Sequence, residues 1–436
     1  MLKVCKFGGS SLASSMQFLK VKDIIESDAS RKAIVVSAPG KRNKDDNKIT
    51  DLLYLLGAHI KYGVDYTQIY SQIKNRYFEI RDELKIDLAL EDEFASLEKE
   101  FSKTISEEYL VSRGEYFSAK LLASLIGYTF IDSKDIIEFN YDGSLNEEKN
   151  AINIKKALEE HDKIVIPGFY GSYKNGSIKL FSRGGSDVTG AIVASSLEAT
   201  IYENWTDVSG IKVADPKIID SPKGISEITY DELRELSYMG ASVLHEETIF
   251  PVQELNIPIN ILNTNRPLEK GTIISKTCKD NKNIITGIAG KKDFTSFNIL
   301  KSRGSNKAEL IRLVLDVFSK FNVNIEHIPT GIDTFSVVVS TEEIDKCYYD
   351  LISEINKIKD ITKLNVEKEI SLVAVVGRNM ALKPGTSGKI FALLGNNNIN
   401  IKMIAQGANE INIIVGVKNS DFEKTIKVIY DNMIME

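Results

Sequence analysis

Short apolar runs alternate with helix-like amphipathic stretches along the first two-thirds of the chain. Five of the runs end in Gly, Pro or polar residues and are predicted as buried strands: 2–7, 33–38, 164–169, 200–205 and 258–262. Apolar residues at helical spacing follow the first strand, over 18–25. Because strands that alternate with helices are typical of parallel sheets covered by helices, we expect an α/β domain with a mainly parallel sheet over residues 1–283.

One stretch of this domain has a different pattern. Residues 65–110 are highly charged, lack Pro and Gly, and place apolar residues at helical spacing. We therefore expect a helical excursion on the surface of the first domain. The sequence assigns it no function.

After residue 282 the pattern changes to two units of βαββα type. The first is expected over 295–367 and includes strands at 295–300 and 324–328, whereas the second covers 368–436 and lacks its own last strand. An isolated strand-like run at 284–290 fills that place, so the second domain is expected to comprise 284–294 plus 368–436, with the first unit inserted. Such an internal duplication indicates two small α+β domains.

Composition excludes several classes of protein. The 436 residues suffice for two or three domains, and 43% apolar with 27% charged residues is typical of a soluble globular protein. A net charge of −6 with scattered basic residues argues against nucleic acid as the main partner. We find no apolar stretch long enough for a membrane span, and three distant cysteines without C-x-x-C spacing favour a reduced, cytoplasmic protein. The four scattered histidines indicate no His-rich metal site.

Two glycine-rich runs carry the candidate chemistry. Lys6-Phe-Gly-Gly-Ser-Ser11 follows the first strand, and Ser182-Arg-Gly-Gly-Ser-Asp187 lies between a strand-like and a helix-like run. Each run couples a cationic side chain to two glycines and a hydroxyl, which is what phosphoryl transfer needs: close backbone N–H groups and fixed positive charge. The pair therefore predicts a small-molecule kinase.

A third polar group follows the predicted strand 200–205. Thr206 and Asp207 supply a hydroxyl and a carboxylate at the carboxyl end of a strand, where nucleotides commonly bind in α/β sheets. The same pair is also typical of helix or turn capping. Asp187 could organise the lysines or receive Mg²⁺ beside the phosphates.

Five segments together resemble the motifs of the aspartokinase family. They are Val4-Cys-Lys-Phe-Gly-Gly-Ser-Ser11, Val35-Val-Ser-Ala38, Phe181-Ser-Arg-Gly-Gly-Ser-Asp-Val-Thr189, Trp205-Thr-Asp-Val-Ser-Gly-Ile211 and Tyr238-Met-Gly-Ala-Ser-Val-Leu-His-Glu-Glu-Thr248. The resemblance covers essentially the whole chain and includes two C-terminal units that look like ACT domains, as in lysine-sensitive aspartokinases. It implies an amino-acid-kinase fold and transfer of the ATP γ-phosphoryl group to the β-carboxylate of L-aspartate, giving 4-phospho-L-aspartate.

The resemblance also implies roles for individual residues. It places Lys6 and Asp187 as the catalytic pair. The nucleotide-binding positions are Lys6, Gly8, Gly9, Ser10, Ser37, Thr206, Asp207, Lys212 and Lys217. The aspartate-binding positions are Thr50, Glu115, Arg183, Gly184 and Gly185. The cofactor is ATP with Mg²⁺, and no protein side chain is assigned as a metal ligand. Because the β-carboxylate is already ionised at pH 7, the reaction needs no general base.

Two positions depart from the family pattern Gly-Ala-Lys-Val-Leu-His-Pro. Ser242 stands for the lysine, which commonly reaches the nucleotide, and Glu246 stands for the proline. Lys212 and Lys217 lie nearby in sequence and are candidates to compensate.

The ACT-like units imply regulation. The matching effector positions are Ile299, Ser305, Asn324, Ile325, Glu326 and Thr330. Glu326 is expected to meet a ligand ammonium group, with lysine as the first choice of effector and threonine as the second. The resemblance further implies a homodimer through the ACT domains, with a tetramer left open. Two alternatives remain at this point: an amino-acid kinase of the glutamate type, and a catalytically inactive amino-acid sensor.

Overall fold

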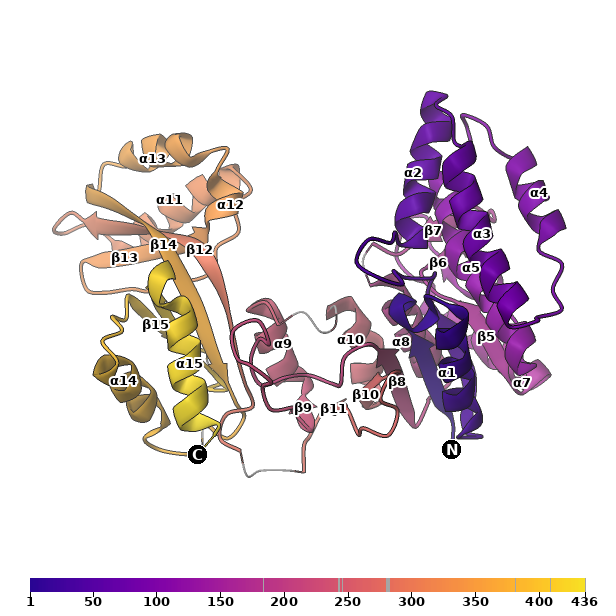
Figure 1. Cartoon of the computed structure of the whole chain (residues 1–436). Helices are drawn as coiled ribbons and strands as arrows, with labels where there is room; N and C mark the ends of the chain where they lie inside the picture. The colour runs from indigo at the N-terminus through magenta and orange to yellow at the C-terminus, as the bar shows by residue number, and fades with distance from the viewer. Residues whose placement is uncertain are drawn as a thin grey trace. The chain divides into compact units, whose positions relative to one another are not determined.

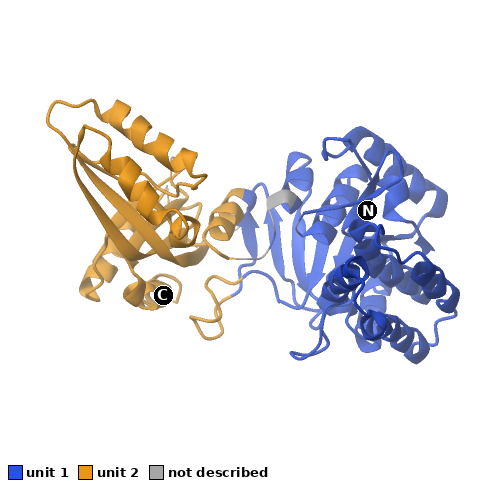
Figure 2. Cartoon of the chain, turned by 90° about the horizontal axis from the view of Figure 1, so that it is seen from above, with its two compact units in different colours: residues 1–211, 224–230, 243–278 blue, residues 212–223, 231–242, 279–436 orange. Residues whose placement is uncertain are grey.

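The structure, a computed structural model, describes the chain except residues 183, 242–243, 245, 280–282, 381, 408 and 436 and the side chains of 246–247. The chain divides into two compact units (Figure 2). Unit 1 comprises 1–211, 224–230 and 243–278, and unit 2 comprises 212–223, 231–242 and 279–436. Among the described residues, no helix is both long and apolar enough to cross a membrane.

Unit 1 is built on an eight-stranded sheet in the order β3-β5-β2-β1-β8-β10-β11-β9. Its strands are β1 (Lys3–Phe7), β2 (Arg31–Val36), β3 (Thr129–Phe130), β5 (Ile164–Pro167), β8 (Ile201–Thr206), β9 (Glu227–Thr229), β10 (Ile259–Asn263) and β11 (Thr272–Ser275). All neighbouring pairs are parallel except β10 and β11. The expected mainly parallel sheet is therefore confirmed. Three further strands form a separate small sheet in the order β4-β6-β7: β4 (Glu138–Phe139), β6 (Tyr170–Tyr173) and β7 (Ile178–Leu180).

Helices cover both faces of the large sheet (Figure 1). On one face, α1 (Ser15–Glu26) and α5 (Glu107–Ile126) share a core with Cys5 and Phe7 of β1. Residues that alternate with these on β1 point to the other face, where α8 (Gly185–Ser196) packs on β1, β2 and β8. Next to α8 lie α7 (Glu147–His161) and α10 (Glu246–Glu254). The short helices of this unit are η1 (Gly9–Leu12) and α6 (Ser133–Ile136).

The helical excursion expected over 65–110 forms as α3 (Thr67–Glu83), α4 (Glu91–Lys99) and the start of α5. In Figure 1, α3 lies beside α5 and α2 (Ile49–Tyr62), and these helices contact one another. The segment also buries aromatic side chains, since the Phe94 ring of α4 stacks on Phe117 of α5 with centroids 4.2 Å apart. These helices thus form an outer layer that shares the core of unit 1.

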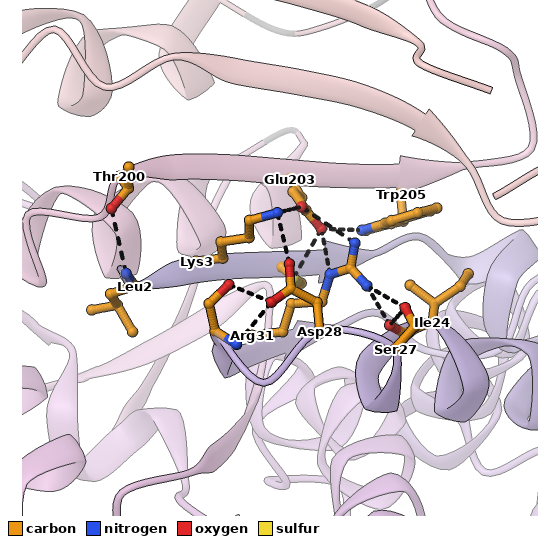
Figure 3. A network of polar contacts seen from close by, with 11 residues as sticks. Leu2, Lys3, Ile24, Ser27, Asp28, Arg31, Thr200, Glu203 and Trp205 are labelled. Carbon is orange, nitrogen blue, oxygen red and sulfur yellow. Dashed lines mark hydrogen bonds and ion pairs between the residues drawn. The ribbon is translucent and has the colours of Figure 1, made fainter. Parts of the chain in front are cut away.

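A buried carboxylate ties together the three central strands (Figure 3). Glu203 of β8 accepts hydrogen bonds from Arg31 Nε of β2 at 2.8 Å, Lys3 Nζ of β1 at 2.9 Å and Trp205 Nε1 at 3.0 Å. Cys5 adds a thiol contact at 3.4 Å. Burial alone would raise the pKa of Glu203, but the bonds to Arg31 and Lys3 hold that pKa below its usual value. The charge is therefore kept and compensated.

Unit 2 contains a five-stranded antiparallel sheet in the order β13-β12-β14-β16-β15. Its elements are β12 (Gly287–Lys301), β13 (Thr334–Ser340), β14 (Ile361–Val376), β15 (Met403–Gln406), β16 (Asn412–Lys418), α11 (Lys307–Lys320), α12 (Thr341–Ile344), α13 (Tyr348–Asn356), α14 (Thr386–Asn396), η2 (Asn419–Asp421) and α15 (Phe422–Met433). The strands β12 and β14 pair along almost their whole length, with register shifts around Phe294. The two expected strands at 284–290 and 295–300 are therefore one continuous strand.

The strand expected at 324–328 does not form. The described backbone there makes only isolated bridges, His327 with Val338 and Thr330 with Phe335. Pro329 lies between the two bridges and lacks the N–H group that a continuous ladder needs, which accounts for the difference.

Helix α9 (Tyr230–Tyr238) lies in sequence between elements of unit 1, yet from Asp231 onward it belongs to unit 2. Its fully buried Glu232 accepts hydrogen bonds from Thr286 Oγ1 at 2.6 Å, the Arg378 N–H at 2.8 Å and Arg378 Nη1 at 2.9 Å. These charge-assisted bonds fix α9 to the strands and loops of unit 2.

Substituting Glu203→Leu should reduce the free energy of unfolding of unit 1 by roughly 3 kcal/mol, because Arg31 would be left buried without its carboxylate partner, whereas Lys3 keeps Asp28. Trp205, the single tryptophan, lies in this cluster, so its fluorescence during urea unfolding measures the change. The depressed pKa of Glu203 means that the parent should lose this advantage as the pH falls below about 4.5, while the variant should not.

Glu198→Gln, which removes an exposed partner of Lys155, is the matched control and should change little. Equal stability of Glu203→Leu and the parent at pH 7 would contradict a stabilising role for the buried carboxylate.

Candidate active site

The candidate site lies at the carboxyl ends of the central parallel strands. The chain passes from β1 to β2 on one side of β1, whereas β8 pairs with β1 on the other side. This is a topological switch point, the place where open α/β sheets bind ligands. The loops after β1, β2 and β8 carry most of the predicted nucleotide-binding residues.

Lys6 and Asp187 meet at this point. Lys6 Nζ lies 2.6 Å from Asp187 Oδ1, and the side chains are 9% and 23% exposed. Asn204 Nδ2 of β8 donates to the same Oδ1 at 2.8 Å. The sequence brought Lys6 and Asp187 into one site by resemblance, and the geometry places them in direct contact.

Asp187 stands in the first turn of α8, behind the second glycine run. Gly184 has φ 57°, a left-handed conformation that begins the helix, and a Cβ on Gly185 would lie 2.3 Å from the Phe169 ring. Both glycines are thus required by the backbone itself. They direct the helix N-terminus, which favours anions, toward the site. Arg183 lies outside the described residues.

The first glycine run is held close to the loop that follows β2. A Cβ on Gly9 would lie 2.8 Å from the Ala38 carbonyl oxygen, and the Gly40 N–H donates to the Gly9 carbonyl at 2.8 Å. The Gly8 N–H donates to the Trp205 carbonyl at 3.0 Å, so this amide is used within the protein. A Cβ on Gly8 would lie 3.5 Å from Lys6 Nζ. Gly8 therefore leaves room for the lysine, and a phosphate cradle here would rely on Gly9 and Ser10.

The loop after β2 carries Ser37 and leads to Thr50. The half-buried Ser37 donates its N–H to the Phe7 carbonyl at 3.1 Å, which joins the ends of β2 and β1. Thr50 is half-buried in the first turn of α2, whose Ile49 N–H donates to the Pro39 carbonyl at 3.1 Å. Both residues therefore lie on backbone that is tied to the first glycine run.

Glu115 of α5 is the most perturbed carboxyl group near the site. It is 4% exposed, Oε1 accepts the Ala38 N–H at 3.0 Å, and Oε2 has no hydrogen-bond partner among the described residues. Burial raises the pKa of Glu115 to about 8 from an ordinary 4.5, although Lys6 acts in the opposite direction. Such a carboxyl group is suited to receive a cationic ligand group.

Thr206 and Asp207 follow β8. Thr206 Oγ1 donates to Asp207 Oδ1 at 3.1 Å, and Asn263 of β10 donates to the Asp207 carbonyl at 3.3 Å. Lys212 and Lys217 belong to unit 2, and their contact with nucleotide stays a prediction. Ser242 and the side chain of Glu246 lie outside the described residues.

Sequence reasoning missed three parts of this site: Asn204, Tyr202 and the Ala38 amide. Tyr202 OH donates to the Asp187 carbonyl at 3.1 Å. Alternation along β8 places Tyr202 and Asn204 on one face, and this signal was available in the sequence. The Ala38 amide carries no signal of this kind, because a backbone group leaves no trace in residue type.

The effector positions lie in unit 2. The Ile299 side chain is 1% exposed and lies in the core of the first ACT-like unit. It can therefore support an effector site by packing beneath it, without contacting the ligand. Asn324 donates its N–H and Nδ2 to Glu343, at 2.7 and 2.9 Å. Ser305 Oγ donates to the Ser302 carbonyl, and Ile325 packs at the edge of the same core. The Glu326 N–H donates to the Val338 carbonyl at 2.9 Å, while Thr330 forms the bridge to Phe335.

The described side chains provide only some of the ligands that a bound metal ion needs. No cluster of three or more His, Cys, Asp or Glu side chains suited to a metal occurs within the described part of the chain. Asp187 nevertheless offers a partly exposed carboxylate beside a cationic, phosphate-compatible loop. Because Mg²⁺ in kinases is held by one or two carboxylates plus substrate phosphates, these residues fit a metal that arrives with the nucleotide.

Comparison with known proteins identifies the family of the chain. The family model described as the amino acid kinase family matches residues 1–263, and an ACT domain model matches 373–433. The chain is 36% identical to aspartokinase 3 of Bacillus subtilis, with 98% of both chains covered. It is 47% identical to aspartate kinase of Clostridium acetobutylicum, with 99% of both chains covered and a TM-score of 0.91. Escherichia coli aspartokinase III in complex with lysine and aspartate is 25% identical, with a TM-score of 0.76 and 99% of both chains covered.

The chain therefore belongs to the amino acid kinase family, and within it to the aspartokinases. The expected fold and the recognised family are confirmed. This membership favours aspartate kinase over the glutamate-type and inactive-sensor alternatives. The domain boundaries expected at 1–283, 295–367 and 284–294 plus 368–436 stay a prediction.

The buried carboxyl group of Glu115 should make stability depend on pH. Between pH 4.5 and about 8 the folded chain holds a proton on Glu115 that the unfolded chain releases, so stability should fall as the pH rises through this range. Glu115→Gln removes this dependence, and its unfolding temperature should exceed that of the parent by a margin that grows from pH 5 to pH 8. Calorimetric scans across this range measure the margin.

Glu108→Gln on the same helix, at a partly exposed position, controls for the loss of one negative charge. A margin for Glu115→Gln that stays constant with pH would contradict the assignment.

Proposed function

We propose that this aspartokinase transfers the γ-phosphoryl group of ATP to the β-carboxylate of L-aspartate at the switch point between β1 and β8. The observation that carries the proposal is the 2.6 Å contact between Lys6 Nζ and Asp187 Oδ1 at the carboxyl ends of these strands. A fixed cation beside two glycine loops is suited to the charge that develops on the transferring group. The acceptor carboxylate is ionised at neutral pH, so positioning and charge neutralisation suffice.

Each site residue then has a role in the proposal. Lys6 neutralises the transferring phosphoryl group, while Asp187 fixes Lys6 and would hold Mg²⁺, which supplies further charge neutralisation when bound. Phosphates lie against the amides of Gly9 and Ser10 and near Gly8. The remaining nucleotide contacts are assigned to Ser37, Thr206, Asp207, Lys212 and Lys217.

The proposed aspartate subsite uses Glu115, Thr50, Arg183, Gly184 and Gly185. Glu115 receives the α-ammonium group, since its buried Oε2 has no hydrogen-bond partner among the described residues. A bound cation would lower the raised pKa of the Glu115 carboxyl group and so favour its ionised form. Arg183 holds the α-carboxylate, and the N-terminus of α8 at Gly184 and Gly185 favours the same negative charge. Thr50 adds a hydroxyl from the start of α2.

We further propose that lysine inhibits the enzyme through the ACT units, with threonine as the second choice. Support comes from the matching ACT domain model and from the E. coli relative solved with lysine and aspartate. Glu326 provides the carboxylate for the effector ammonium group, and Asn324, Ile325 and Thr330 are its neighbours in sequence among the proposed effector positions. The edge strand β15 suits pairing with a second copy, so a homodimer through the ACT units is proposed. Light scattering after gel filtration tests the dimer, and a monomer would contradict it.

The activity is tested with ATP, Mg²⁺ and hydroxylamine, which traps acyl phosphates as hydroxamates. L-Aspartate should give hydroxamate and L-glutamate should give little. Lys6→Met should reduce kcat by about 1,000-fold or more, because it removes the fixed charge at the transferring group. Lys74→Met, at an outer position on α3, is the matched control and should retain activity. A folded parent that is active with neither acid would overturn the proposed function.

The effector proposal predicts that Glu326→Gln raises the lysine concentration for half-maximal inhibition by about tenfold or more, because a charged hydrogen bond to the ligand is lost. Inhibition curves for lysine and threonine measure this effect. Glu342→Gln, a neighbouring exposed glutamate, is the control. Unchanged lysine inhibition in Glu326→Gln would rule out the assigned role, and inhibition by threonine alone would make threonine the effector.

A further inference from the structure

Strand β8 holds Asp187 at two separate points. Tyr202 and Asn204 lie two residues apart on one face of the strand and are 0% and 4% exposed. Tyr202 OH donates to the main-chain carbonyl of Asp187 at 3.1 Å, whereas Asn204 Nδ2 donates to its carboxylate at 2.8 Å. The first contact fixes the backbone, and the second fixes the side chain.

Asn204 is also the register neighbour of Lys6, because β1 and β8 pair in parallel with Lys6 opposite Asn204. Their side chains leave the sheet on the same face, and both donate to the same oxygen, Oδ1 of Asp187. A carboxylate oxygen has two lone pairs, so two donors occupy Oδ1. Within the described part of the chain no contact is recorded for Oδ2, and the side chain is 23% exposed.

A lysine alone would not give this arrangement. Its ammonium group can pair with either oxygen of a carboxylate that turns about its terminal bond. Asn204 lies on a central strand, so its amide group has a fixed direction. Because this amide donates to Oδ1 of Asp187, it distinguishes Oδ1 from Oδ2. The carboxylate is therefore held with Oδ1 on Lys6 and Asn204, which leaves Oδ2 as the oxygen that neither of them occupies.

We propose that Asn204 is a positioning residue for phosphoryl transfer: it orients the Asp187 carboxylate so that Oδ1 holds Lys6 and Oδ2 faces the nucleotide phosphates and their metal ion. The inference rests on the proposed aspartate kinase activity and adds a residue to it. Asn204 itself touches neither substrate, since its contact is with Asp187. Its loss should therefore affect the reacting geometry more than substrate binding.

The test uses two variants that lack the amide donor and add no charge, Asn204→Leu and Asn204→Ala, in the full-length enzyme. Both should lower kcat by about 10- to 100-fold, the cost of a slightly misplaced catalytic group, while KM for aspartate stays within about twofold. A second readout is independent of turnover: the factor by which Mg²⁺ tightens ADP binding, measured by calorimetry, should shrink in both variants. Glu198→Gln, which removes an exposed partner of Lys155, is the control and should keep the kcat and the Mg²⁺ factor of the parent.

The outcomes separate this inference from the proposed function. If the parent makes aspartyl hydroxamate but both variants keep its kcat and its Mg²⁺ factor, the positioning role is wrong and the kinase assignment stands. A lower unfolding temperature with unchanged kcat and Mg²⁺ factor shows a merely structural role and overturns the inference. If Asn204→Leu does not fold, Asn204→Ala decides. A parent without kinase activity overturns both proposals.

Discussion

The buried carboxylate of Glu203 is the interaction on which the site geometry depends. It joins Arg31 of β2, Lys3 of β1 and its own strand β8, so it bonds across all three strands whose carboxyl ends form the site. A single charge shared by two cations and an indole N–H is costly to leave unpaired, and any slip of one strand would break it. The bonds of Glu203 therefore fix the strand register that places Lys6 beside Asn204.

Because side chains alternate along the strands, the residues of the Glu203 cluster lie on one face of the sheet and those that contact Asp187 lie on the other. On β1, Cys5 points to the Glu203 cluster and Lys6 points to Asp187, although they are adjacent in sequence. On β8, Glu203 and Asn204 divide in the same way. One face of two neighbouring strands thus fixes the register, and the other presents the reacting groups at positions that the register determines.

The sequence was sufficient for the fold and for bringing Lys6 and Asp187 into one candidate site, because a buried strand, a Gly-Gly run and a charged residue each leave a local signal. It was insufficient where the determining partner is distant or is backbone. The Ala38 amide that meets Glu115 is one such case, and the 16-residue strand β14, whose partner β12 merges two expected strands, is another. At 324–328 the apolar alternation was too short to outweigh Pro329.

The division of the chain into units bears on how an effector could act. The catalytic pair and Glu115 lie in unit 1, whereas Lys212 and Lys217 lie on a segment of the kinase sequence that belongs to unit 2. Helix α9 is a second such segment, and the buried bonds of Glu232 to Thr286 and Arg378 fix it there. Under the proposed function, Lys212 and Lys217 would couple effector binding in unit 2 to nucleotide binding, because they belong to that unit.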